Sequence, residues 1–264
     1  MLQYVDTRIL GSGYELRMYN LLFFVEGIYP YIGFLVFVFG TTFRLWYWLK
    51  TPVPLNINLA PTKTTWKAVV GKIVAEVLLF ISLLRNDKVL WVTAWGMHVC
   101  GLVVILASHF FGIIDASVKF YTPYTIPFSK TILYVAACFA FPLIGTLLII
   151  LFRRILTKEI RRISVPTDYV AISLILAHVF GGTYMSFFTK IDMNEVAAWG
   201  MGLFTFHPIV VEGSWIFAVH CTTCFTTIMY FPFSKLFHPL GQITNRWTMT
   251  QKEIELIAGG KVVK

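Results

Sequence analysis

Five long apolar segments dominate this chain and limit the folds that it can adopt. A helix needs about 20 mostly apolar residues to cross the roughly 30 Å hydrocarbon layer of a membrane. Segments of that length cover residues 27–48, 90–114, 130–152, 168–188 and 212–233. Hydrophobic residues make up 57% of the chain and charged residues only 13%, which a soluble domain of 264 residues would not tolerate. We therefore predict an all-α membrane protein, a five-transmembrane-helix bundle that forms one domain over residues 1–264.

Lysine and arginine collect on one side of this predicted topology. Residues 44–88 carry seven, the run RRILTKEIRR at 153–162 carries five, and the tail from Lys235 carries five. Because basic residues near helix ends are retained in the cytoplasm, we expect a protein of a prokaryotic cell membrane with its N-terminus outside the cell and its tail 234–264 in the cytoplasm. Contact with anionic lipid then explains the net charge of +9, so no nucleic-acid partner is expected.

A further helical segment lies between the first two predicted spans. Residues 65–88 have helical periodicity, but Lys72 and Glu76 interrupt their apolar face, and the apolar run after Glu76 is too short to cross. We predict a cytoplasmic interfacial helix here. It either caps the bundle or forms a docking shelf for a soluble partner.

Four histidines fall into two pairs on two of the apolar spans. His98 and His109 lie eleven residues apart on the second span, which returns them to nearly one helix face about 16 Å apart in height. His220 and His238 lie eighteen residues apart on or just past the fifth span, again on one face, at about 27 Å in an ideal helix. The two spans run in opposite senses. Antiparallel packing would set His98 against His238 near the cytoplasm and His109 against His220 near the outside.

Histidine inside a membrane is energetically costly and is usually functional. Neutral imidazole is a suitable axial ligand on both faces of a haem, so the two pairs predict two haem b groups with all four histidines as iron ligands. The separation in height between the two histidines of the second span is about 10 Å smaller than that between the two of the fifth. Pro232 can relieve this mismatch by kinking or ending the fifth helix. The alternative is a non-redox anchor or transporter whose histidines hydrogen-bond across the bundle, relay protons or bind another metal.

Two further histidines have no partner at comparable spacing. His178 lies in the middle of the fourth span, where we expect an interhelical hydrogen bond. His207 lies among aromatic residues in an external segment, where it either packs in the loop or contributes to a quinone pocket.

The cysteines do not indicate a cofactor site. Cys221 and Cys224 form a CxxC, but His220 precedes it, whereas covalent haem attachment needs the histidine after the second cysteine. We interpret both as small packing residues. Together with Cys100 and Cys138 they are dispersed over three spans, and an iron–sulfur cluster needs four thiolates together. Iron–sulfur clusters are therefore expected in a partner.

Several stretches resemble the respiratory nitrate reductase gamma subunit family of dihaem cytochromes b along essentially the whole chain. The matching stretches are IYPYI at 28–32, the run around His98 and His109 that ends HFFG, LFRRIL from Leu151, TFH at 205–207, and His220 followed by FPFSKLFH. The resemblance implies that the cytoplasm-side haem takes His98 and His238 and that the outer haem takes His109 and His220.

The chain also departs from the nitrate reductase member in two ways. That protein spaces its first histidine pair by ten residues, and it lacks the segment 55–88. This segment, with LLRNDKVLW, is more similar to the relatives that serve heterodisulfide reductase and the sulfite-reduction-associated electron-transfer complex. The resemblance therefore implies a subunit of a respiratory oxidoreductase complex that exchanges electrons between a membrane quinol, such as menaquinol, and a cytoplasmic iron–sulfur subunit. It would not be the terminal catalytic subunit; a nitrate reductase gamma subunit is the alternative.

The resemblance also implies a quinone site near the outer haem, where quinol oxidation would release protons outside. His109 and Lys130 match the family's pocket, although Lys130 could instead snorkel to the interface. Asp115 is the acid nearest to His109 in sequence and could accept a proton, or it is simply solvated; His207 is a further candidate. Haem propionates need cationic partners, and the basic candidates on the inner side are Arg44, Arg85 and Lys235.

Overall fold

The computed structural model describes residues 13–51, 66–121, 129–189, 191–211, 215–241 and 244. Every regular element in these ranges is helical. Most of the predicted tail, residues 245–264, lies outside the described residues. Five helices are long and apolar enough to cross a membrane: Leu16–Lys50, Lys88–Phe110, Tyr134–Leu156, Pro166–Phe188 and Trp215–Phe233. The predicted all-α fold with five candidate spans is confirmed. The boundaries differ from the predicted ones in both directions, most at the start of the first span, which begins at Leu16 and not at residue 27.

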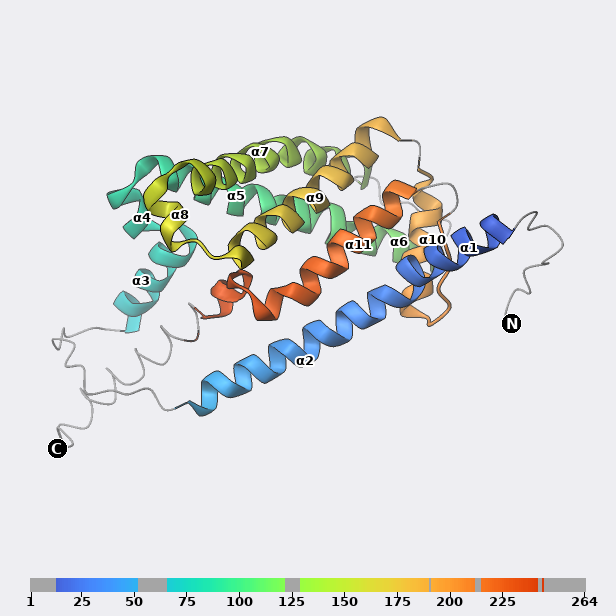
Figure 1. The fold of residues 1–264 in the computed structure, drawn as a ribbon, viewed down its shortest axis with the longest axis horizontal. Helices are drawn as coiled ribbons and strands as arrows, with labels where there is room; N and C mark the ends of the chain where they lie inside the picture. The colour runs from blue at the N-terminus through green and yellow to red at the C-terminus, as the bar shows by residue number, and fades with distance from the viewer. Residues whose placement is uncertain are drawn as a thin grey trace.

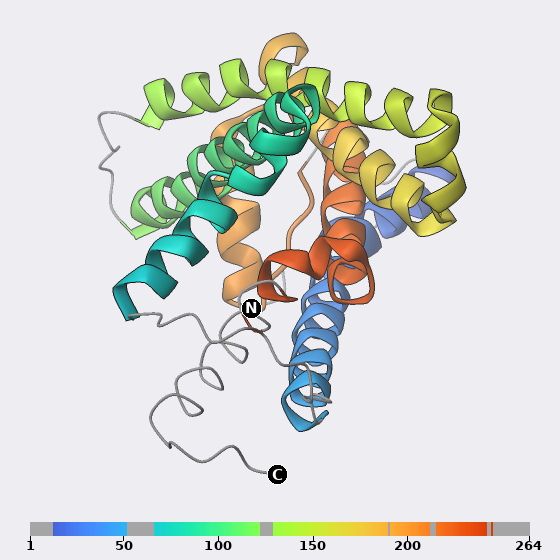
Figure 2. The same cartoon turned by 90° about the vertical axis from the view of Figure 1, so that its left-hand side faces the viewer.

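The spans follow one another round an arc (Figure 2). In that arc α5 packs on α7, α7 on α9, α9 on α11, and α11 on α2. The helices are α2 (Tyr29–Lys50), α5 (Lys88–Val104), α7 (Ser129–Leu156), α9 (Pro166–Phe188) and α11 (Trp215–Tyr230). The chief neighbours of α11 are therefore α9 and α2, and the chief neighbour of α5 is α7. Directly packed helices lie only about 8–10 Å apart, which leaves no room for a large group between them. Because α5 and α11 are not chief neighbours, this restriction does not apply to the space between them.

The core fills the junction of α5, α7 and α9. Its buried members include Cys100, Leu143, Leu147 and Val179. The exterior is also apolar, and Phe39, for example, is 68% exposed. A polar exterior would be expected of a protein in water, whereas an apolar exterior suits contact with lipid. The protein is a multi-pass membrane protein.

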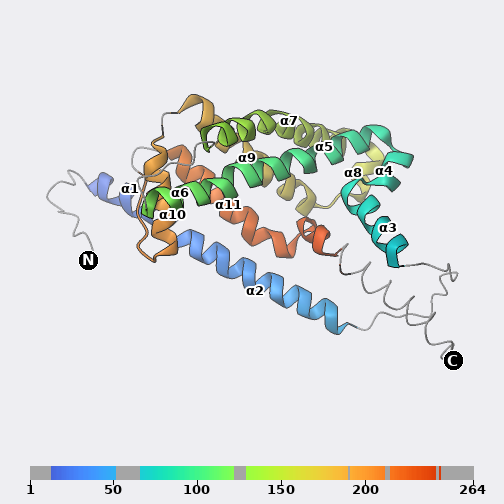
Figure 3. The same cartoon turned by 180° about the vertical axis from the view of Figure 1, so that it is seen from behind.

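Short helices gather at the two ends of the bundle (Figures 1 and 3). One end, here called the α10 end, carries α1 (Gly13–Phe23), α6 (Phe111–Tyr121) and α10 (Met193–Phe204). The other, here called the basic end, carries α3 (Trp66–Leu78), α4 (Ile81–Asn86) and α8 (Lys158–Ile163). The basic end includes the run KEIRRI of α8. The predicted interfacial helix is present as α3 and α4, and Phe80 separates them with a left-handed backbone, φ 51°.

Two spans contain π turns, each of which accommodates one additional residue in the helix. They are η1 (Phe24–Ile28), which carries Glu26, and η2 (Ile105–Phe110), which carries His109. The second turn therefore lies in the stretch of the span that leads from His98 to His109 and ends just after His109.

The fifth span does not continue as a regular helix to His238. Helix α11 ends at Tyr230, and two 3₁₀ turns follow, η3 (Phe231–Phe233) and η4 (Lys235–Phe237). Pro232 lies in the first of them, and Ser234 between them has an extended backbone, with φ −120° and ψ 179°. The ideal-helix estimate of five whole turns therefore does not hold for His238. Pro232 ends the helix, which removes the geometric basis of the mismatch in height.

Candidate haem-binding site

The four histidines meet in two pairs across the bundle. The ring centroids of His98 and His238 are 5.7 Å apart, and those of His109 and His220 are 6.1 Å apart. A metal–imidazole nitrogen bond of about 2.0–2.1 Å sets two rings on opposite sides of one metal with centroids about 6 Å apart. Rotation of a ring about such a bond leaves the bond intact, so the angle between the ring planes is not critical. Both pairs have the spacing that a bis-histidine metal centre needs.

Three of these histidines are held in one tautomer by backbone carbonyls. A carbonyl only accepts hydrogen bonds, so each Nδ1 must carry the proton that it donates. The acceptors are the carbonyl oxygens of Ala94 for His98 (2.7 Å), of His178 for His220 (3.1 Å) and of Lys235 for His238 (2.9 Å). In the neutral imidazole Nε2 then keeps its lone pair, which is the atom that a metal binds.

The fourth histidine, His109, reaches the same state through a serine. The Ser108 hydroxyl donates to the carbonyl of Val104, and its Oγ lies 2.9 Å from Nδ1 of His109. Because the hydroxyl hydrogen is already used, Oγ accepts from Nδ1–H. His109 therefore also presents an unprotonated Nε2.

A glycine makes room for the ring of His220. A Cβ placed on Gly182 of α9 would lie 3.0 Å from Cε1 of His220, closer than ordinary contacts allow. The absence of a side chain lets the imidazole lie directly against α9. The residues around this pair therefore fit an imidazole that is fixed in place and free to bind at Nε2.

Arg44 of α2 holds the turn that leads to His238. Its Nη1 donates to the carbonyl oxygens of Pro232 and Ser234. Its guanidinium also lies 4.7 Å from the ring centroid of Phe237. Arg44 was predicted as a propionate partner, and in the structure its Nη1 is engaged with this turn.

A buried carboxylate ties the same turn to α9. Lys235 Nζ lies 2.9 Å and Arg154 Nη1 3.1 Å from Oδ2 of Asp168, whose side chain is only 2% exposed. Lys235, the second predicted propionate partner, is thus paired with Asp168. Arg85, the third, is exposed in the last turn of α4.

The environment of His238 favours the neutral imidazole. Burial lowers its pKa, and the nearby His98 lowers it further, while the hydrogen bond to the carbonyl of Lys235 opposes this. A neutral ring is the form that binds a metal.

The predicted quinone residues lie towards the α10 end. Asp115 is buried on α6, which packs against α10. His207 is exposed in the loop after α10, and its Nδ1 donates to the carbonyl of Thr205 at 2.7 Å. The side chain of Lys130, at the start of α7, lies outside the described residues.

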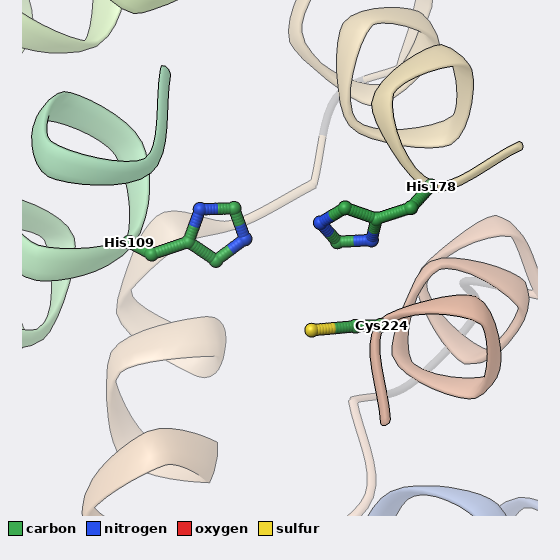
Figure 4. Close-up of side chains that lie close together, drawn as sticks. All are labelled: His109, His178 and Cys224. Atoms are coloured by element: carbon green, nitrogen blue, oxygen red, sulfur yellow. The ribbon is translucent and has the colours of Figure 1, made fainter. Parts of the chain in front are cut away.

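His178 and Cys224, for which the sequence analysis predicted only structural roles, lie beside the pair of His109 and His220. His178 of α9 faces His109, and Cys224 of α11 points into the space beside them (Figure 4). One ligand atom from each of the three lies within 4.8 Å of the others. The hydrogen bond that joins His178 to α11 uses the backbone carbonyl of His178, whereas the Nδ1 of its side chain, for which an interhelical bond was expected, has no hydrogen-bond partner among the described residues. Cys224 lies one turn after His220, a spacing that would have placed it on the same helix face.

Glu26 was missed because the first predicted span began one residue after it. It is fully buried on η1, where its Oε2 accepts from the backbone N–H of Val211 at 2.8 Å and its carbonyl accepts from Nε1 of Trp199 at 2.9 Å. Glu26 thereby ties the loop after α10 to the first span. A single acid at the start of an apolar segment was the available signal.

Comparison with known proteins identifies the family. The nitrate reductase gamma subunit family matches residues 81–252, which is more than half of the chain and includes all four paired histidines. The chain belongs to the nitrate reductase gamma subunit family. The resemblance that the sequence predicted is confirmed.

Relatives of this family member fall into two groups by name. Two are the Hdr-like menaquinol oxidoreductase cytochrome b-like subunits of Archaeoglobus profundus and Archaeoglobus fulgidus, each 28% identical. The first alignment covers 80% of this chain and 74% of the relative, and the second covers 81% and 75%. Respiratory nitrate reductase 1 gamma chain of Escherichia coli is 23% identical, over 89% of this chain and 99% of its own length.

Proposed function

We propose that this chain is a dihaem cytochrome b subunit of a quinol oxidoreductase complex. The observation that carries the proposal is the common state of the four paired histidines. Each donates from Nδ1 to an oxygen, and they meet in two pairs with ring centroids 5.7 and 6.1 Å apart. His98 and His238 would hold one haem b, and His109 and His220 the other. Bound there, the two groups would supply one-electron carriers at two depths of the membrane.

The orientation of the chain would make this arrangement a path across the membrane. The basic end, with the run KEIRRI of α8, would face the cytoplasm because cytoplasmic loops are rich in lysine and arginine. The α10 end would then face outside. The pair of His98 and His238 would be the inner one, and the pair of His109 and His220 the outer one.

Quinol would be oxidised near the outer pair. The names of two relatives specify menaquinol, and menaquinol or a similar quinol is the proposed substrate. Oxidation of a quinol releases protons as well as electrons, so a carboxylate near the site is useful. Asp115 is buried on α6, five residues after the end of η2, the turn that carries His109. It is the candidate proton acceptor. Lys130 and His207 remain predicted contributors.

A cytoplasmic iron–sulfur subunit is the proposed electron partner. The four cysteines of the chain are unpaired and are divided among α5, α7 and α11. The ligand cluster found among the described residues contains only one of them, Cys224. If the complex acts on sulfur compounds or disulfides, the iron–sulfur clusters that carry the electrons would therefore lie in a partner subunit. The two relatives named Hdr-like favour this over nitrate chemistry.

The purified complex tests the proposal. Its reduced-minus-oxidised visible spectrum should show sharp low-spin b-type bands, and added menaquinol analogue should reduce them under anaerobic conditions. A non-redox anchor or transporter predicts no such bands. Co-purification separates the two redox alternatives: a partner with cysteine-rich cluster motifs supports the proposed assignment, whereas a partner with a molybdenum cofactor supports a nitrate reductase gamma subunit.

A further inference from the structure

A third imidazole lies beside the outer pair. The ring centroid of His178 is 5.3 Å from that of His109 and 4.1 Å from that of His220, and the rings of His178 and His220 are stacked at 19°. His178 and His220 come from the adjacent helices α9 and α11, while His109 faces them from η2. Two imidazoles are therefore stacked together across from the single imidazole of His109.

The side chain of His178 is the one whose hydrogen bonding is incomplete. Its Nδ1 is buried and has no hydrogen-bond partner among the described residues. Buried polar atoms almost always have a partner, and leaving one without a partner costs about 1–3 kcal/mol. A ring nitrogen of His178 also lies within 4.8 Å of one of His109, close to the separation of about 4 Å that two metal–nitrogen bonds span. The unsatisfied atom and the spacing both indicate a ligand between these two residues.

The inner pair has a different neighbour. There the ring of Phe80 lies edge-on to His98, with centroids 5.1 Å apart. Phenylalanine cannot bind iron. The two centres therefore differ in one respect that an experiment can exploit: within the described residues, a spare imidazole is found against the outer pair.

We propose that His178 is an alternative axial ligand at the outer centre and exchanges with His220 opposite His109. This inference rests on the proposed function. The exchange would replace one iron–nitrogen bond, that to His220, by one to His178. Both imidazoles are neutral before and after, and no electron is gained or lost. The hydrogen bond from Nδ1 of His220 to the carbonyl of His178 can persist in both states, so the two residues stay joined while the ligand changes.

Substitution by asparagine removes the ligand nitrogen and keeps the hydrogen-bond donor. His220→Asn retains an N–H group for the carbonyl of His178, and the matched control His238→Asn retains one for the carbonyl of Lys235. We expect His220→Asn to keep the full haem content of the wild-type complex and a low-spin, bis-histidine outer centre with a shifted electron paramagnetic resonance signal. His238→Asn should lose its low-spin inner centre, and the double variant His178→Asn/His220→Asn should lose the outer one.

The inner haem reports whether each outer-pair variant has folded. The inference is overturned if His220→Asn keeps the inner haem but loses the low-spin outer centre to the same extent as the double variant. It is equally overturned if the outer centre acquires the spectrum of a thiolate ligand, which would assign the role to Cys224. Should His220→Asn not be recovered folded, His178→Asn alone decides: the wild-type ferric outer centre should show two low-spin signals and the variant one, and an unchanged single signal overturns the inference. A wild-type complex without haem would instead contradict the proposed function.

Discussion

Lys235, three residues before His238, donates a hydrogen bond of 2.9 Å to the buried carboxylate of Asp168. Asp168 also pairs with Arg154 and accepts from the backbone N–H of Val165, so it joins the end of α7, the start of α9 and the turn after α11. The position of His238 depends on this junction because α11 itself has ended at Tyr230.

Asp168→Asn should loosen the inner centre. The substitution removes the negative charge between two cations, of which Arg154 is 28% and Lys235 65% exposed. We expect a loss of about 1–3 kcal/mol, between the values for exposed and buried pairs. The inner haem signal should broaden or weaken while the outer one is unchanged. Lys235→Met, which removes only the more exposed partner, should cost less than about 1 kcal/mol. Equal effects of both variants, measured as melting temperatures in detergent, would contradict this account.

Gly40→Ala should push the same turn away from α2. A Cβ at Gly40 would lie 2.8 Å from Cγ of Pro232 and 2.9 Å from Cζ of Phe233. Overpacking of this kind costs about 1–3 kcal/mol, and the inner haem should again be the one affected. Gly145→Ala in α7 is the control, since a Cβ there meets nothing within 4 Å. It should be neutral or stabilise the helix by up to about 1 kcal/mol. Haem content and thermal unfolding of the two variants test the contrast.

Glu26 should be needed for its shape and hydrogen bonds. Glu26→Gln keeps an oxygen for the N–H of Val211 and should be nearly as stable as the wild type. Glu26→Ala leaves that buried N–H without its acceptor, which costs about 1–3 kcal/mol. Protease sensitivity of the loop around residues 207–211 should rise in the alanine variant alone. A glutamine variant as unstable as the alanine variant would show that the charge, and not the hydrogen bond, is required.

Asp87 should make stability depend on pH at the basic end. Its pKa is lowered, first by the hydrogen bond from the backbone N–H of Leu90 and also by Arg153, whose Nη2 lies 2.7 Å away. A lowered pKa in the folded state stabilises the fold above the ordinary aspartate pKa of about 3.9, and the contribution is lost as the pH falls through the folded value. Asp87→Asn can still cap α5. As the pH is lowered from 6 to 3, the melting temperature of this variant should therefore fall less than that of the wild type. Parallel plots of melting temperature against pH for the two proteins would contradict this account.

The five spans could be predicted from the sequence because apolar length encodes them. The pairing of His98 with His238 was predicted from an ideal helix, although the chain reaches His238 through two 3₁₀ turns. Helix breaks were less accessible. The left-handed backbone of Phe80 is unfavourable for its residue type and lies where the indole N–H groups of Trp91 and Trp95 donate to the carbonyls of Leu79 and Leu78. The π turn η2 lies in an almost continuously apolar span, where one additional residue leaves no visible break in the pattern. The position of His178 against His220 depends on how α9 packs on α11, which spacing along one helix cannot give.

Haem content in histidine variants tests the central claim most directly. The wild-type complex should contain two haems b per chain. His98→Asn and His238→Asn should each leave the same single haem, His109→Asn should leave the other, and His98→Asn/His109→Asn should leave none. If His98→Asn and His238→Asn remove spectrally different haems, or if the double variant keeps its haem, these histidines do not hold the cofactors in the pairs described.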